Sequence, residues 1–169
     1  DSLITSLGKS ARVRAEQYMQ RQILTATWRY YLDGFPSGGV GVRAGIIRPR
    51  RPPLLSVTAL KYVDTLGVTQ TMAASAYQVD KATEPARIIP AYGTFWPVTR
   101  DQLNAVWVEY TCGYGTSLTA EQEPIKDAIK VLAADFYEQR SSIVAGTIVS
   151  PVASRTVEAL LSPFRVFWS

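Results

Sequence analysis

Apolar residues recur at helical spacing near both ends of the chain. Residues 2–24 carry them at three- and four-residue steps, opposite charged and amide side chains, which predicts an amphipathic helix that needs a packing partner. This stripe consists of Leu3, Ile4, Leu7, Ala11, Ala15, Tyr18 and Met19. A second stripe predicts a helix from about residue 123 to near Arg140, with Pro124 in its first turn. A short last helix is expected over residues 154–161, stopped by Pro163.

The pattern changes to β-type alternation in the middle of the chain. Residues 105–110 alternate and are rich in strand-forming side chains. The segment Asp64-Thr65-Leu66-Gly67 predicts the turn of a hairpin, because its glycine allows a positive φ. Two further short strands are expected at residues 76–79 and 87–89.

Two stretches interrupt this regular structure. Residues 34–53 are rich in Gly, Pro and Arg and predict an extended loop, because proline removes a backbone donor and restricts its neighbour. Residues 141–152 are also expected to form a loop.

The order of these elements predicts an α+β fold. We expect a helical frame of two long helices and a short C-terminal helix, with a central antiparallel β insertion. A length of 169 residues suits one ordinary domain. The chain is therefore expected to form a single domain, residues 1–169, with residues 54–115 as a β-rich insertion within it.

The composition excludes several kinds of site. The chain has no histidine, and Cys112 is its one cysteine. An internal disulfide, a zinc site built from His or several Cys ligands, and a His-based catalytic triad are therefore ruled out. No apolar run approaches the roughly 20 residues that a membrane helix needs, so no membrane contact is expected.

The remaining candidates for chemistry have simpler interpretations. Glu121, Glu123 and Asp127 lie at a helix N-terminus, where acidic side chains interact favourably with the helix dipole. The glycine-rich segment 37–41 lacks the Lys-Ser/Thr pair and the helix that follow a phosphate-binding loop. We therefore expect no catalytic residue, no metal site, no cofactor and no enzymatic activity. An unfamiliar carboxylate-based hydrolase remains an alternative.

Positive charge is concentrated in the first third of the chain. Residues 1–62 hold ten Lys or Arg against three acidic residues, whereas the remainder holds eight against eleven. Four arginines lie close together in the predicted loop: Arg43, Arg48, Arg50 and Arg51. They are candidates to lie near DNA phosphates without reading bases. The alternatives are a solubilising loop, or one that pairs with acidic residues of a neighbouring subunit.

The C-terminal segment is apolar and aromatic after the helix-stopping Pro163. Its candidate contact residues are Leu160, Leu161, Phe164, Arg165, Phe167 and Trp168. Such a segment either packs back on its own core or anchors in a partner protein, since aromatic side chains are typical interface hot spots.

The order of short motifs along most of the chain resembles the phage head–tail connector (adaptor) family, often described as gp6-like, in its longer phiE125 gp8-like branch. The segments that carry the resemblance are Ala11-Arg12 with Glu16 and Arg21, Thr27-Trp28, residues 33–36, residues 50–53, Tyr62-Val63-Asp64, Tyr77-Gln78-Val79, Trp96-Pro97, residues 106–108, residues 113–115, residues 124–126, residues 137–140 and residues 160–165. Residues 141–154 have no counterpart in this resemblance.

The resemblance implies a structural role in the neck of a virion. It implies a ring of identical subunits, commonly a dodecamer, between the portal protein and the stopper or tail proteins, assembled in the host cytoplasm. Double-stranded DNA would pass through the ring without sequence specificity, and the C-terminal segment would bind the portal. The alternatives are a stopper or tail-terminator ring protein, or a small DNA-binding accessory protein.

Overall fold

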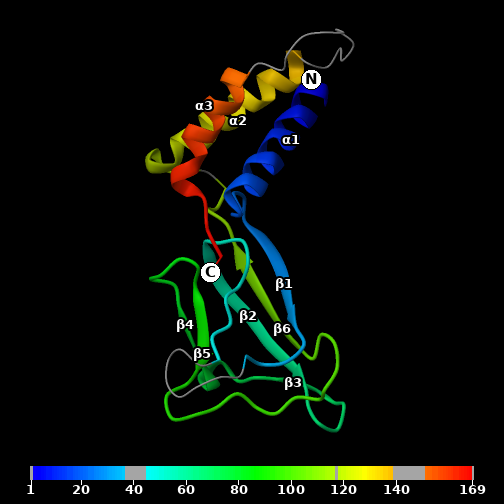
Figure 1. Ribbon diagram of the computed structural model, residues 1–169. Helices are drawn as coiled ribbons and strands as arrows, with labels where there is room; N and C mark the ends of the chain where they lie inside the picture. Colours follow the sequence, from blue (N-terminus) through cyan, green and yellow to red (C-terminus); the bar gives the residue numbers. More distant parts are fainter. Residues whose placement is uncertain (1, 37–44, 117, 139–150, 169) are drawn as a thin grey trace. The chain divides into compact units, whose positions relative to one another are not determined.

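The computed structural model describes residues 2–36, 45–116, 118–138 and 151–168. They divide into a helical unit, residues 1–23 and 115–169, and a β unit, residues 24–114. Helices and an antiparallel sheet make the fold mixed α+β, as the sequence predicts (Figure 1). Among the described residues, no helix combines the length and the apolar character that a membrane crossing requires.

The helical unit contains α1 (Ser2–Met19), α2 (Glu123–Glu138) and α3 (Pro151–Leu161). Helix α2 packs against both α1 and α3 (Figure 1). The buried apolar residues described in this unit are Ala11, Ala15, Met19, Ile23, Ile125, Ala128, Val157, Leu161 and Val166. Alanine at three of these positions lets the helix axes approach closely, since their separation depends on the side chains at the contact.

Helix α1 ends at Met19, five residues before the end expected from its apolar stripe. Gln20 has a φ of +58°, the left-handed conformation that commonly closes a helix. The buried carboxylate of Glu16 then accepts hydrogen bonds from the Ile23 backbone N–H at 3.0 Å and from the Gln22 side chain at 3.1 Å. The apolar pattern continues past residue 19, but these side-chain contacts turn the chain out of the helix.

The starts of α2 and α3 are set by local chemistry. Before α2, the side chain of Thr119 and that of Gln122 bond to each other's backbone in a capping box, which opens a 3₁₀ turn over Ala120–Gln122. Helix α3 begins at Pro151, three residues earlier than expected, so the end of the expected 141–152 loop is helical. Proline suits a first helical position because its missing N–H has no partner there.

The main sheet of the β unit has four antiparallel strands in the order β1-β6-β2-β3. They are β1 (Ala26–Leu32), β2 (Leu54–Val63), β3 (Thr69–Thr71) and β6 (Val106–Cys112). The expected turn after β2 is present. Strand β1 was not expected from the sequence, and it pairs along its whole length with β6.

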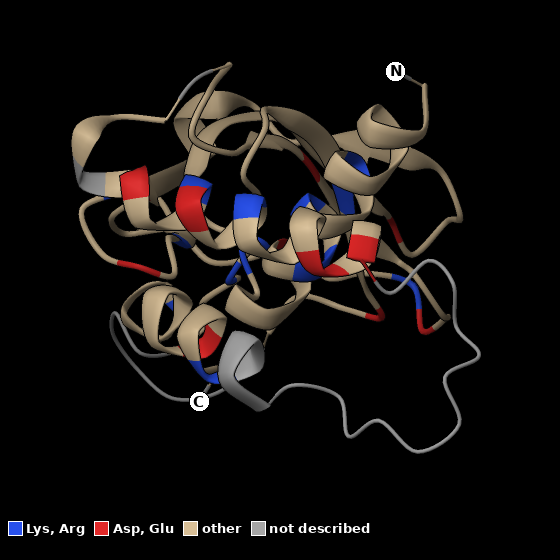
Figure 2. Ribbon diagram, turned by 90° about the horizontal axis from the view of Figure 1, so that it is seen from above, with Lys and Arg blue, Asp and Glu red and all other residues tan. Residues whose placement is uncertain are grey.

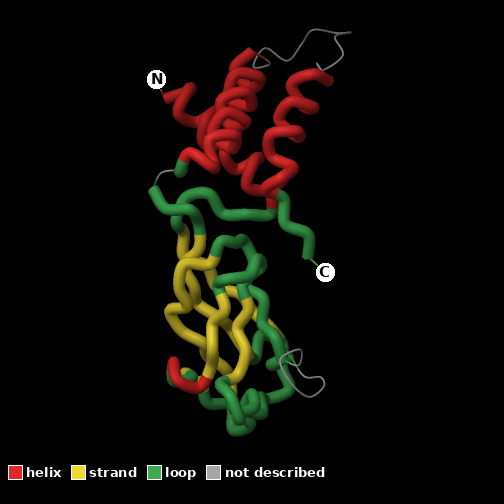
Figure 3. The backbone as a smooth tube through the Cα atoms, turned by 90° about the vertical axis from the view of Figure 1, so that its left-hand side faces the viewer, coloured by secondary structure: helices red, strands yellow, loops and turns green. Residues whose placement is uncertain are grey.

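A second, two-stranded sheet consists of β4 (Tyr77–Asp80) and β5 (Arg87–Pro90). Ile88 of β5 also forms an isolated bridge with Ile47. Figure 3 follows these strands and the loops that join them. Both strands lie within one residue of the segments that the sequence predicts.

The core of the β unit lies on one face of β6. Val106, Val108, Tyr110 and Cys112 are buried, whereas the residues between them are partly exposed. This is the period-two pattern of a strand with one face against a core. The other buried members of that core are Ile47, Leu54, Leu60, Ala86 and Ile88.

The chain enters and leaves the β unit at the same end of the sheet. Ala26, at the start of β1, pairs with Cys112, at the end of β6. Gly113 follows with a φ of +121°, and a Cβ there would lie 2.7 Å from the carbonyl oxygen of Leu24. Only glycine permits this close approach without a shift of the backbone.

Candidate functional site

The C-terminal segment packs back on its own helical unit as far as Val166. Leu161 is fully buried and Val166 is nearly so. The Val166 backbone N–H donates to the carbonyl oxygen of Met19 at 3.0 Å, and Arg21 Nε donates to the carbonyl oxygen of Phe164. The C-terminal segment is thus attached to the end of α1 by one backbone–backbone hydrogen bond and by one hydrogen bond from the Arg21 side chain.

Beyond Val166 the segment presents an exposed aromatic side chain. Phe167 is 73% exposed, and Leu160, Phe164 and Trp168 are partly buried. The guanidinium of Arg165 lies 5.1 Å from the ring centroid of Phe167 and 5.3 Å from that of Tyr18. The six predicted contact residues therefore separate into buried Leu161, three partly buried residues, and exposed Arg165 and Phe167.

The basic loop lies beside the entry end of the sheet. Tyr110 donates its hydroxyl hydrogen to the carbonyl oxygen of Arg50 at 2.8 Å, which anchors the loop to β6. Burial raises the pKa of Tyr110, so its hydroxyl stays protonated and able to donate. Arg43 lies outside the described residues.

The arginines of this loop differ in their surroundings. The Arg51 guanidinium lies 4.1 Å from the ring centroid of Trp28, and that of Arg50 lies 5.9 Å from Tyr30. Cation–π contact of this kind holds a guanidinium over a ring face and leaves its edge N–H groups directed away from that face. Arg48 is exposed. The structure brings Arg50 and Arg51 together over the aromatic residues of β1. The sequence did not predict this arrangement, because it did not predict strand β1.

A charge network on the face of the sheet opposite the core was also missed. Glu109 of β6 pairs with Arg29 of β1 at 2.7 Å and with Lys61 of β2 at 3.5 Å. Burial alone would raise the pKa of Glu109, but Lys61 and Arg29 outweigh it and hold the pKa below its usual value. The one sequence feature that could have indicated this network is Glu109, a charged residue within the predicted strand 105–110.

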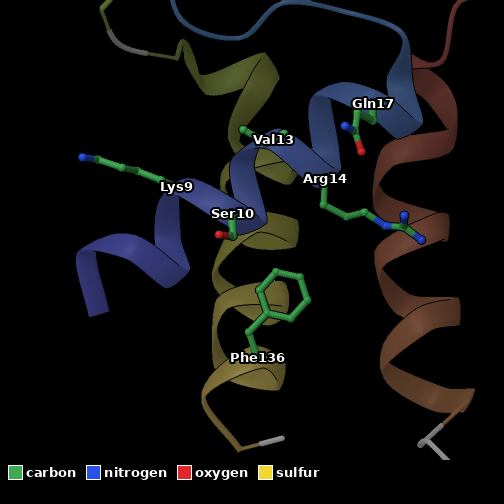
Figure 4. Close-up of a pocket in the computed structure, with 6 residues that line it drawn as sticks. All are labelled: Lys9, Ser10, Val13, Arg14, Gln17 and Phe136. Carbon is green, nitrogen blue, oxygen red and sulfur yellow. The ribbon is translucent and has the colours of Figure 1, made fainter. Parts of the chain in front are cut away.

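The helical unit contains a shallow depression of about 400 Å³ between α1 and α2. Lys9, Ser10, Val13, Arg14 and Gln17 of α1 line it together with Phe136 of α2. Figure 4 shows the Lys9 and Arg14 side chains pointing to opposite sides, so their charges do not converge on one ligand. Seen from above, acidic and basic residues are interspersed over the helices (Figure 2).

The carboxylates at the start of α2 have lysine partners. Glu123 pairs with Lys126 at 3.0 Å and Asp127 pairs with Lys130 at 2.9 Å. Among the residues that the structure describes, no group of three or more Cys, Asp and Glu side chains is placed to hold a metal ion. Cys112 is fully buried in β6.

No protein-family model and no curated protein matches this chain. Solved structures of gene transfer agent (GTA) particles do. A chain of the virion of the native GTA particle covers 100% of this chain and 79% of its own length, with 23% sequence identity and a TM-score of 0.74.

Chains of the GTA neck are similar to the same degree. One, from the neck of the empty particle computed with C6 symmetry, has 24% identity, a TM-score of 0.71 and coverage of 100% and 80%. Another, from the neck of the native particle computed with C12 symmetry, has 23% identity, a TM-score of 0.70 and coverage of 100% and 85%. The whole chain therefore has the fold of chains found in the neck of GTA particles.

Proposed function

We propose that this chain is a structural neck protein of a phage-like particle, and specifically a head-to-tail adaptor. It would form a ring beneath the portal, join the head to the tail and pass double-stranded DNA. The observation that carries the proposal is the fold similarity to neck chains over 100% of this chain. The order of sequence motifs, which resembles the connector family, supports it independently.

We infer a ring of identical subunits, and the symmetry of the similar assemblies supports this inference. The neck structures that contain these chains were computed with C6 and C12 symmetry. Cyclic rings close through heterologous contacts, in which two different surfaces of each subunit meet. A dodecamer is the stoichiometry that we propose, with the portal on one side and stopper or tail proteins on the other.

The exposed part of the C-terminal segment is the proposed portal contact. Phe167 is a large apolar side chain left in solvent beside the charged Arg165. Aromatic and arginine side chains dominate binding energy at protein interfaces. Leu161 supports this contact indirectly, because its burial within the helical unit positions the segment that follows.

The basic loop is the proposed DNA-proximal surface. Arg48 is exposed, and Arg50 and Arg51 are held over aromatic rings. Guanidinium groups presented in this way interact with phosphates without reading base sequence. A channel that passes a genome needs such contacts to be weak and independent of sequence.

Quantitative mass spectrometry of purified particles tests the proposed function. We expect this chain and the portal protein in near-equal copy numbers, because each forms one ring of the neck. The portal protein, measured in the same sample, is the internal reference for the copy number of this chain. Absence of the chain from intact particles contradicts the proposal.

Truncation after Val166 tests the portal contact. The truncated chain keeps the buried Leu161 and Val166, so we expect it to fold but to lose most of its binding to purified portal rings. Phe167→Ala should also weaken binding to the portal rings. The matched control is Leu55→Ala, which removes an exposed apolar side chain of β2. Portal binding that is unchanged by both C-terminal variants contradicts this contact.

A further inference from the structure

The main sheet of the β unit has two edge strands, β1 and β3. Within the part of the chain that the structure describes, β1 pairs only with β6, and β3 pairs only with β2. Figure 1 shows β1 as the outermost strand on its side of the sheet. Backbone N–H and C=O groups that point out of such an edge form a template for another strand.

The hydrogen bonds at the two ends of β6 show which of its backbone groups face β1. The Val63 N–H donates to the carbonyl oxygen of Ala105 at 2.8 Å, and the Gly113 N–H donates to that of Pro53 at 2.9 Å, so residues 105 and 113 point to β2. Backbone groups alternate in direction along an antiparallel strand, so the even-numbered residues of β6 point to β1. Their partners in β1 are Ala26, Trp28, Tyr30 and Leu32.

The backbone groups of the intervening residues of β1 therefore point out of the sheet. These residues are Thr27, Arg29 and Tyr31, and all three are exposed. They lie opposite the partly exposed residues of β6, on the face away from the core. The outer edge of β1 thus combines outward backbone groups with side chains on the solvent face of the sheet.

The edge of β3 has the same arrangement. The Met72 N–H donates to the carbonyl oxygen of Leu60 at 2.8 Å, so residue 72 points to β2. By the same alternation Gln70 also points to β2, whereas Thr69 and Thr71 point out of the sheet. All three residues of β3 are exposed.

The outward residues of both edges have side chains on one face of the sheet. Thr71 lies opposite Lys61, and Lys61 pairs with Glu109 on the face away from the core. In an antiparallel pair, residues directly opposite each other have side chains on the same face. A joint between the edge of β1 and the edge of β3 would therefore keep the core face and the solvent face continuous from one sheet to the next.

Strand direction also permits this joint. Each strand of the sheet is antiparallel to its neighbour, so β1 and β3, at the two ends of a four-stranded order, run in opposite directions. A second copy placed beside the first in the same orientation presents its β3 antiparallel to β1. The contact joins two different edges, so it is heterologous and repeats from copy to copy, as a cyclic ring requires.

The side chains at the two edges do not oppose such a contact. Neither strand contains proline, and the charge of Arg29 in β1 is paired with Glu109 at 2.7 Å. The residues of β3 are uncharged. Tyr31 would lie near Thr69 or Thr71 of the next copy, and pairs of an aromatic with a β-branched residue stabilise antiparallel strands.

Pairing of β1 with β1 of another copy is less favourable. Two antiparallel β1 strands centred on Arg29 would place like charges opposite each other, which is destabilising. The contact would also be isologous, and it would close a dimer while leaving the edge of β3 unpaired. The edge of β3 in a second copy is therefore the occupant that fits β1.

We propose that neighbouring subunits join through their sheets, with the outer edge of β1 in one copy paired antiparallel with the outer edge of β3 in the next. The inference rests on the proposed ring of identical subunits and assigns the strands that join it. Main-chain hydrogen bonds supply this contact, as in other cases of strand addition to a sheet edge.

Disulfide trapping in assembled particles tests the inference. One variant combines Tyr31→Cys with Thr71→Cys, and another combines Tyr31→Cys with Thr69→Cys, so that both neighbouring registers are covered. Within one copy β1 and β3 are three strand spacings apart, roughly 14 Å, which a disulfide cannot span. The native Cys112 is fully buried. The matched control combines Tyr31→Cys with Ser56→Cys, an exposed position of the interior strand β2.

We expect oxidised particles that carry one of the two edge pairs to give a ladder of covalently linked copies on a non-reducing gel, whereas the control pair stays monomeric. Particles that contain the chain at portal stoichiometry but give no ladder with either pair overturn this inference and leave the proposed function standing. Links to a different particle protein also overturn it, and so does a linked dimer formed by Tyr31→Cys alone. Absence of the native chain from intact particles contradicts the proposed function instead.

Discussion

At the residue scale, a buried glutamate decides where the first helix ends. Glu16 lies one turn before the end of α1 and is nearly inaccessible to solvent. Its carboxylate accepts two hydrogen bonds from the residues that leave the helix, and Arg12 lies 3.8 Å away on the preceding turn. A buried charge is tolerated when it is paired and hydrogen-bonded in this way.

Replacing Glu16 should destabilise the helical unit in a graded way. Glu16→Ala leaves the backbone N–H of Ile23 buried without its acceptor, which costs about 1–3 kcal/mol. Glu16→Gln keeps an oxygen acceptor and should cost less. Chemical denaturation of the two variants and the native chain measures the difference. Equal losses for both variants would show that charge, and not hydrogen bonding, matters at this position.

At the element scale, strand β6 contributes alternate side chains to the two faces of the sheet. Its odd-numbered residues Trp107, Glu109 and Thr111 are partly exposed, and its even-numbered residues from Val106 to Cys112 are buried. Glu109 is paired with cations from both neighbouring strands. One carboxylate thus connects three strands on the face away from the core.

The pairing of Glu109 predicts a specific loss of stability in acid. Its pKa is lowered in the folded chain, so its stabilising contribution is fully present above the ordinary glutamate pKa of about 4.3. The contribution is lost as the pH falls through the lowered folded-state value. Asp64 and Asp80, whose pKa values are also lowered, act in the same direction.

Thermal unfolding measured between neutral pH and pH 3 checks this expectation. Glu109→Gln should lower the melting temperature at neutral pH and reduce its decline in acid, because one of the titrating groups is gone. Glu138→Gln, at an exposed position near the end of α2, is the matched control. A decline that is as steep in Glu109→Gln as in the native chain would contradict the role of Glu109.

At the scale of the whole molecule, the chain builds two units with separate cores. The β unit is a continuous segment, residues 24–114, whose ends are adjacent because β1 and β6 pair from Ala26 and Cys112 onward. The helical unit is made from both ends of the chain. Adjacent ends are a common property of segments that fold as units.

We therefore expect a fragment of residues 24–114 to fold on its own. Its core of Leu60, Ile88, Val106, Val108 and Tyr110 lies entirely within the fragment. Circular dichroism and a cooperative thermal transition check this directly. The matched destabilised variant is Leu60→Ala, which should cost about 2–5 kcal/mol as a large-to-small change in a core. A fragment without a cooperative transition would show that the helical unit is required.

Prediction from sequence succeeded where the spacing of apolar residues along a short segment follows a single helix or strand period. The apolar stripes of α1 and α2, the alternation of β6 and the glycine turn at residues 64–67 are properties of neighbouring residues, so they can be read from a short window. It failed at β1, where the segment Thr27–Leu32 mixes exposed aromatic and charged side chains. That strand is stabilised by pairing with β6, about 80 residues later in the chain.

The sequence by itself determined the α+β class, the order of most elements, and the absence of any site that needs histidine or several cysteines. These follow from composition and from side-chain periods, which do not depend on distant residues. Only the tertiary structure decided which arginines lie over aromatic rings, and that Leu161 is buried while Phe167 is exposed. Each of these depends on contacts between residues far apart in the chain, and the free energy of such contacts is set by the packed fold as a whole.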